Sequence, residues 1–125
     1  MARFKFKLKL NRNELLMLAA GCEAAAKAAG CEDAAEYAYE RKNAATLSVI
    51  ETCERLWSRL RNMYRPDREK YSLRLGATEV HILTDVMLPL MQDLEEPLAR
   101  AMGYAFQEEL RKQIEREVNI YNAMR

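Results

Sequence analysis

The sequence predicts a mainly α protein of the α+β type, in which an antiparallel ribbon of two strands lies on a core of four helices. Two segments in which apolar and polar residues alternate, 3–10 and 70–75, indicate the strands. Each is followed by long stretches with apolar residues every three or four positions, which indicate helices. Because the two strand patterns match at an offset of 65 residues, we expect one domain over residues 1–125, built from a strand–helix–helix unit that occurs twice, at 3–65 and 68–125.

The first strand is predicted from Arg3 to Leu10, with an apolar face and a basic face. Asn11 and Glu14 follow at the spacing of a capping box, and Asn13 is an alternative N-cap. A helix is therefore expected to run from this point to about Ala29, where Gly30 suits a helix C-terminus. A second helix is predicted from Glu32 to Tyr64, since Pro66 excludes helical geometry at the residue before it.

The second half repeats this order. A strand of the same kind covers Lys70–Leu75, and helices are expected at 77–94 and 97–122, with a break at residues 95–96. Pro97 suits the first turn of the last helix, whereas Pro89 lies inside the helix before it and is expected to kink it.

Two strands from equivalent halves can pair antiparallel, and we predict a register with Lys7 opposite Ser72. A slip by two residues would keep every side chain on the same face. The apolar side chains then face the helices, and the basic ones collect on the outer face of the ribbon, where like charges opposite one another are unfavourable. The candidate nucleic-acid-binding residues are Arg3, Lys5, Lys7, Lys9, Arg12, Lys70 and Arg74.

Charge is strongly polarised along a chain whose net charge is only +1. Residues 1–12 carry five basic side chains and no acid, and residues 55–74 carry seven against two acids. Such a separation favours an anionic partner, DNA being the most concrete case. The alternative interpretation is that the lysines guard an exposed ribbon against edge-to-edge aggregation.

The segment Lys5–Glu40, and more weakly Lys70–Ala105, resembles the ribbon-helix-helix DNA-binding fold: an alternating strand, a helix cap, a helix, a turn and a second helix. The resemblance implies a ribbon whose outward side chains enter the DNA major groove, here with both strands from one chain. It places Lys5, Lys7, Lys9, Ser72 and Arg74 against base edges. In that family the start of the second helix meets a phosphate. Here those positions read Cys31-Glu32-Asp33 and Glu95-Glu96-Pro97, whose carboxylates would repel one.

Composition and motifs exclude several other classes. A chain that is 50% hydrophobic and 31% charged, with 4 Gly and 3 Pro, is not expected to be disordered. No apolar run is long enough to cross a bilayer, and the N-terminus lacks the apolar stretch of a signal peptide, so no membrane partner is expected. The three cysteines, Cys22, Cys31 and Cys53, are an odd number without metal-type spacing, which favours a reduced, cytoplasmic protein.

Nothing in the sequence indicates catalysis. There is no glycine-rich phosphate loop and no elbow-type serine, and we expect no enzyme activity, metal or cofactor. His81, the only histidine, is expected to pair with Asp85 on a helix surface.

The long helices carry more apolar surface than one core needs, which leaves a protein partner or self-association as the alternative function. The predicted interface residues, at heptad spacing, are Ile50, Trp57 and Tyr64. The last helix has a similar apolar row, from Phe106 to Tyr121.

Overall fold

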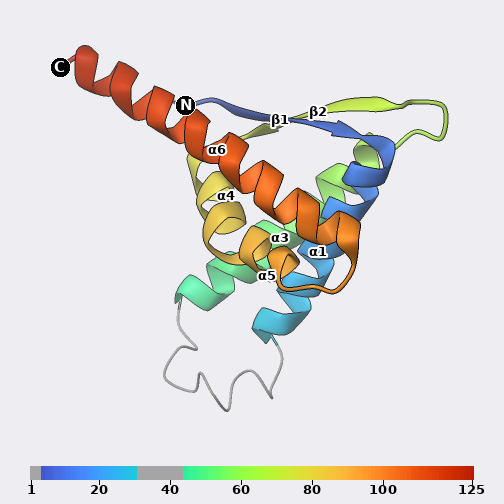
Figure 1. Cartoon of the computed structure of the whole chain (residues 1–125). Helices are drawn as coiled ribbons and strands as arrows, with labels where there is room; N and C mark the ends of the chain where they lie inside the picture. The colour runs from blue at the N-terminus through green and yellow to red at the C-terminus, as the bar shows by residue number, and fades with distance from the viewer. Residues whose placement is uncertain (1–3, 31–43) are drawn as a thin grey trace.

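The computed structural model describes residues 4–30 and 44–125 of the chain. Within these ranges the protein is mainly helical and contains one two-stranded antiparallel sheet, which confirms the predicted mainly α class with a two-stranded ribbon. The ribbon lies across one end of the helices (Figure 1). In chain order the elements are β1 (Phe6–Asn11), α1 (Arg12–Gly30), α3 (Ala44–Met63), β2 (Lys70–Leu75), α4 (Ala77–Ile82), η2 (Leu83–Met87), α5 (Leu88–Gln92) and α6 (Pro97–Ala123).

Most predicted boundaries lie within two residues of the observed ones. β1 is an exception, because it begins at Phe6 and not at Arg3, which lies outside the described residues. α3 is described from Ala44, so the predicted helical residues 32–43 also lie outside the described part of the chain. The predicted break before Pro97 and the predicted turn after Tyr64 are confirmed.

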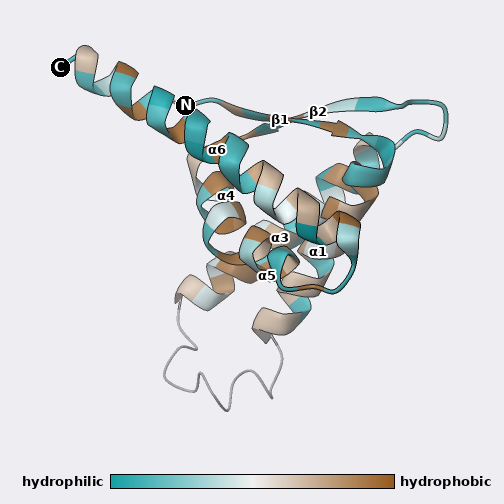
Figure 2. Cartoon of the chain, in the orientation of Figure 1, coloured by the Kyte–Doolittle hydropathy of each residue, from teal (hydrophilic) through white to brown (hydrophobic). Residues whose placement is uncertain are grey.

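The ribbon buries one face, as the alternation predicts. Phe6, Leu8 and Leu10 of β1 are buried, as are the apolar residues of β2, while the residues between them are exposed. These side chains form one core with residues of every helix. Figure 2 shows hydrophobic segments where α1, α3 and α5 meet below the ribbon. The helical stripes therefore cover the apolar face of the ribbon, and its polar face is left outward.

The register differs from the predicted one by two residues. Lys7 lies opposite Arg74, and Lys9 lies opposite Ser72. The inward and outward sets are unchanged, because a slip of two preserves the face of each side chain. No short turn joins the two strands, so packing of the helices sets the register. One of the pairs, Leu8 and Leu73, joins residues that are 65 positions apart.

Helix starts use the predicted chemistry. The backbone N of Asn11 donates to Oε1 of Glu14, and the backbone N of Glu14 donates to Oδ1 of Asn11, both at 2.8 Å. This capping box makes Asn11 the N-cap and rules out the alternative, Asn13. At the start of α4, the backbone N of Gly76 donates to Oε1 of Glu79 at 2.9 Å, which is the same contact 65 residues later.

A π-helical turn, η2, precedes Pro89, where the sequence predicted a kink. In this turn the N–H of Leu88 donates to the carbonyl of Leu83, five residues back. The next bond of that kind would come from residue 89 to the carbonyl of Thr84, but proline has no N–H. Nε2 of Gln107 on α6 donates to the Thr84 carbonyl instead, at 2.9 Å. A side chain from another helix thus replaces the missing backbone donor.

We predict that Gln107→Leu lowers the free energy of unfolding by about 1–2 kcal/mol, because it leaves the Thr84 carbonyl without a donor. In a Pro89→Ala background the loss should shrink, since the substituted residue supplies an N–H for the same carbonyl. Chemical denaturation of the two single variants and the double variant measures this coupling. An equal loss from Gln107→Leu in both backgrounds would contradict the explanation.

α6 extends past the core. Phe106 and Leu110 are buried and Ile114 is partly buried, but Val118 and Tyr121 are exposed. Figure 1 shows the C-terminal end of α6 projecting beyond the other elements, past the start of β1.

Candidate nucleic-acid interface

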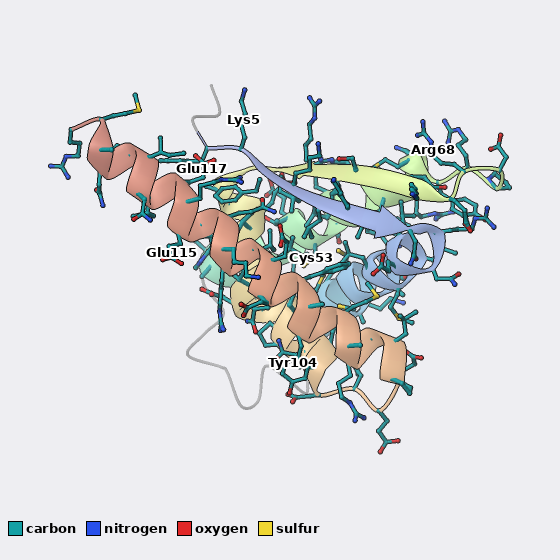
Figure 3. All side chains as sticks on the ribbon, turned by 45° about the horizontal axis from the view of Figure 1, so that its top comes forward. Lys5, Cys53, Arg68, Tyr104, Glu115 and Glu117 are labelled. Atoms are coloured by element: carbon teal, nitrogen blue, oxygen red, sulfur yellow. The ribbon has the colours of Figure 1, made fainter. Side chains whose placement is uncertain are left out.

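The outer side of the ribbon carries the predicted basic side chains together. Lys7 and Lys9 of β1 and Lys70 and Arg74 of β2 are exposed, as is Lys5 just before β1. Figure 3 shows Lys5 projecting away from the helices, and Arg68 lying at the opposite end of the ribbon. We call Lys5, Lys7, Lys9, Lys70 and Arg74 the cationic face.

The described carboxylates form no ion pair with this face. Among residues 4–30 and 44–125, no ion pair includes a member of the cationic face. The pairs are Arg12–Glu69, Lys27–Glu23, Arg55–Glu51, Arg59–Glu79 and His81–Asp85. Five positive charges are therefore available to a partner, within a span of six residues on each strand.

Side chains cap both edges of the ribbon. Gln113 of α6 bonds the backbone of Lys7 twice: Oε1 accepts from the Lys7 N at 2.9 Å, and Nε2 donates to the Lys7 carbonyl at 2.7 Å. On the opposite edge, Nη2 of Arg59 donates to the carbonyl of Arg74. Arg59 also pairs with Glu79, with 2.7 Å between Nη1 and Oε2. Each edge thus has a backbone group satisfied by a side chain, which hinders addition of a further strand.

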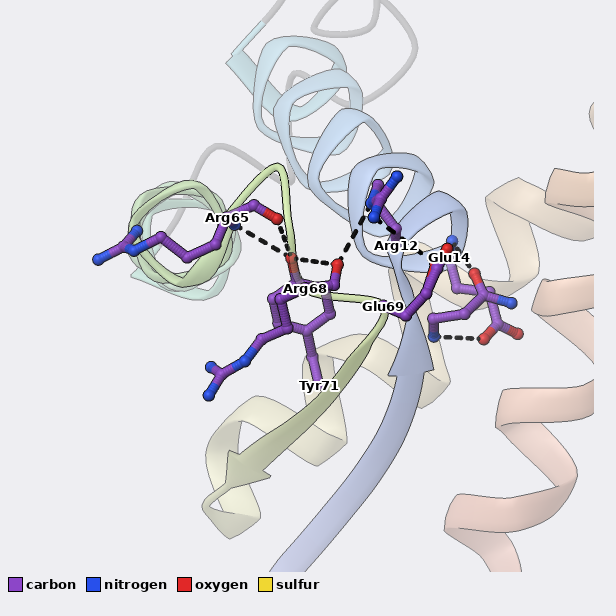
Figure 4. A network of polar contacts seen from close by, with 7 residues as sticks. Arg12, Glu14, Arg65, Arg68, Glu69 and Tyr71 are labelled. Atoms are coloured by element: carbon purple, nitrogen blue, oxygen red, sulfur yellow. Dashed lines mark hydrogen bonds and ion pairs between the residues drawn. The ribbon is translucent and has the colours of Figure 1, made fainter.

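A hydrogen-bond network braces the turn before β2 (Figure 4). The Tyr71 hydroxyl accepts from the backbone N of Arg65 at 3.0 Å and lies 2.9 Å and 3.1 Å from the carbonyls of Arg65 and Arg68, to which it can donate. Nε of Arg12 also donates to the Arg68 carbonyl, at 3.2 Å, and its Nη2 lies 3.7 Å from Oε2 of Glu69. Arg12, predicted to assist binding, is thus engaged in holding this turn.

Two further arginines lie next to the predicted site and were not expected there. Arg68 is exposed at the turn, with its guanidinium 5.7 Å from the centre of the Tyr71 ring. Arg116 of α6 lines a groove of about 1060 Å³ between β1 and α6, together with Lys5 and Lys7. Charge clustering around residues 55–74 marks Arg68 in the sequence, but no local signal brings Arg116 to a strand more than 100 positions away.

A carboxylate of the protein itself caps the N-terminus of α6. Glu96 is the N-cap, and its Oε2 accepts from the backbone N of Ala99 at 2.6 Å. A phosphate at this helix end would meet that carboxylate, as the sequence predicts. The equivalent positions, Cys31 to Asp33, lie outside the described residues.

The predicted interface residues Ile50, Trp57 and Tyr64 are all half-buried on α3 or directly after it. Trp57 and Tyr64 pack against the core, and the Arg61 guanidinium lies 4.8 Å from the centre of the Trp57 ring. On the same face Leu47 is 66% exposed.

The histidine and the two described cysteines have structural roles. His81 and Asp85 are exposed and paired, with 3.0 Å between Nδ1 and Oδ2, as predicted. Cys22 and Cys53 are buried free thiols, and burial raises the pKa of Cys22 well above its usual value and that of Cys53 to about 11. Both therefore stay protonated and unreactive at neutral pH. Cys31 lies outside the described residues.

Within residues 4–30 and 44–125, no group of three or more His, Cys, Asp or Glu side chains is placed to hold a metal ion. In the same ranges, no helix combines the length and the apolar character needed to cross a bilayer.

Comparisons with protein-family models, with curated proteins and with solved structures find no match to this chain.

Proposed function

We propose that this is a non-enzymatic, cytoplasmic binding protein whose cationic face binds duplex DNA. The observation that carries the proposal is the set of five basic side chains, free of internal ion pairs among the described residues, on the exposed side of one ribbon. Two buried free thiols, Cys22 and Cys53, favour a reducing compartment.

The dimensions of the ribbon suit the DNA major groove, which admits a two-stranded β-ribbon. Outward side chains on one strand are about 6.8 Å apart, because each residue rises about 3.4 Å. Stacked base pairs rise about 3.4 Å each along the helix axis, so successive outward side chains reach different base pairs. Lysine and arginine are the side chains that best bind the O6 and N7 acceptors of guanine, and both also bind phosphates.

Electrostatics and the capped edges favour a binding role for the lysines. Lys7 lies directly opposite Arg74, an unfavourable pair that an anion would relieve. Lysines that only guard the ribbon against aggregation are less needed, because side chains of Gln113 and Arg59 already bond backbone groups on its two edges.

Internal symmetry supports the proposal that residues 3–65 and 68–125 are two copies of a strand–helix–helix unit, as in a tandem ribbon-helix-helix protein. The strand pairing places Leu8 opposite Leu73, which is 65 positions away. Sγ of Cys22 on α1 lies 3.2 Å from Sδ of Met87, which is again 65 positions away. Contacts between equivalent positions are expected near a local two-fold axis, and duplex DNA has matching two-fold symmetry.

Salt dependence tests the proposed function. If each of the five cations neutralises one phosphate, the binding constant for a duplex should fall with a log–log slope of about −4.5, and a cation that contacts only a base edge makes the slope smaller. Raising monovalent salt from about 50 to 200 mM should then weaken binding about 500-fold. Fluorescence anisotropy with a labelled duplex of mixed sequence measures this. Absent or salt-insensitive binding would reject the proposal.

The second candidate function, self-association through α3, is favoured by one observation. Leu47 is largely exposed on the face that also carries Ile50 and Trp57. If α3 pairs with a second copy, light scattering should give twice the 14.5 kDa of one chain. Because Leu47 lies outside the core, Leu47→Glu should yield a folded monomer, whereas Tyr104→Glu on the exposed side of α6 should leave the dimer intact. A wild-type monomer at high concentration would exclude this function.

A further inference from the structure

The pseudo-symmetry of the cationic face has one break. A rotation about an axis through the Leu8–Leu73 pair exchanges residues that are 65 positions apart. It exchanges Lys5 with Lys70 and Lys9 with Arg74, so these four cations form two matched pairs. The remaining pair is Lys7 and Ser72, a long cation and a short neutral hydroxyl.

From this break, and resting on the proposed function, we infer that the protein recognises an imperfect inverted repeat and binds it in one orientation. Bases that face Lys9 and Arg74 are equivalent in the two half-sites, because both side chains are cations that select guanine acceptors. Bases that face Lys7 and Ser72 are not equivalent. Lysine selects guanine, whereas a serine hydroxyl both donates and accepts and therefore discriminates less.

The surroundings of the unmatched pair strengthen the asymmetry. Both backbone polar groups of Lys7 bond Gln113, the N–H as donor and the carbonyl as acceptor, on the edge away from β2. This fixes the point from which the Lys7 side chain extends. Gln113 corresponds to Ser48 at the 65-residue offset, and among the described residues no side chain bonds the backbone of Ser72 as Gln113 bonds that of Lys7. The two half-sites therefore face one anchored cation and one neutral side chain.

Selection from a randomised duplex library tests the inference with three proteins: the wild type, Ser72→Lys and Lys7→Ser. The wild type should enrich an inverted repeat with guanine at the Lys7 position in one half-site only. Ser72→Lys should add guanine at the equivalent position of the other half-site and make the repeat symmetric. Lys7→Ser should also yield a symmetric repeat, but without guanine at either position. Both substituted side chains are exposed, and circular dichroism checks that each protein is folded.

Binding to single duplexes gives the size of the effect. Replacing the guanine that faces Lys7 should weaken wild-type binding about 5- to 150-fold. The same replacement in the half-site that faces Ser72 should change it by less than about twofold, since no selective contact is lost.

The outcomes separate the inference from the function on which it rests. DNA binding with a symmetric wild-type motif, with no motif, or with a motif unchanged by Ser72→Lys overturns the inference and leaves the proposed function standing. Failure to bind any duplex at low salt overturns both.

Discussion

Replacing Lys5, Lys7 and Lys9 by alanine should reduce the affinity for duplex DNA about 125-fold or more, since each lost base or phosphate contact weakens binding at least about fivefold. The salt slope should fall by up to about 2.7, because up to three fewer counterions are released. These side chains are exposed and form no ion pairs with the described residues, so their removal should leave the fold intact. Anisotropy titrations at several salt concentrations give both quantities.

A matched control removes the same charge elsewhere. Lys27, Arg111 and Lys112 are exposed on α1 and α6, away from the outer face of the ribbon. Alanine at these three positions should weaken binding by less than about threefold, because only long-range attraction is lost. Equal losses in the two triple variants would show that net charge, and not the cationic face, governs binding.

Gly103→Ala should lower the free energy of unfolding by about 3 kcal/mol, although alanine is normally the better helix residue. Gly103 lies where α6 packs on α5. A Cβ there would lie 2.8 Å from Cγ of Gln92, 2.9 Å from the carbonyl oxygen of Leu88 and 3.0 Å from the backbone N of Gln92. Two of these atoms belong to the backbone of α5, so the substitution has to separate the helices. Urea denaturation followed by circular dichroism measures the loss.

Gly21→Ala on α1 is the comparison for this effect. Its Cβ would lie 3.2 Å from Sδ of Met91, and the three nearest atoms are all in the flexible side chains of Met91 and Met87. Methionine can adjust, and alanine gains about 1 kcal/mol of helix propensity, so the net change should stay within about 1 kcal/mol of zero. If both alanines were tolerated, the close contact of α5 and α6 would not be as rigid as the packing implies.

Local signals predicted most of the elements that build the candidate site. Alternation in the two strands identified which side chains face outward, and this holds for any register of the same parity. Asn11 and Glu14 predicted the start of α1 because a capping box needs only residues three apart. Pro66 and Pro97 marked a helix end and a helix start through the geometry of the proline ring.

Contacts between distant segments could not be predicted in this way. The register placed Arg74, and not Ser72, opposite Lys7, because the strands are far apart in the chain and no short turn aligns them. Pro89 indicated an irregular helix, but the form of the irregularity depends on a donor from α6, Gln107. Arg12 was expected to face a partner, yet the Arg68 carbonyl and Glu69 lie close enough to engage it.

By itself, the sequence determined that this protein is mainly helical, that it has two strands with a basic outer face, and where most of its helices begin and end. These properties depend on side-chain period and on backbone chemistry within a few residues. Only the tertiary structure decided which strand residues face one another, which edge groups Gln113 and Arg59 satisfy, and which cations of the ribbon stay free of ion pairs with the described residues. Those outcomes depend on how the helices pack, which brings together residues up to 106 positions apart.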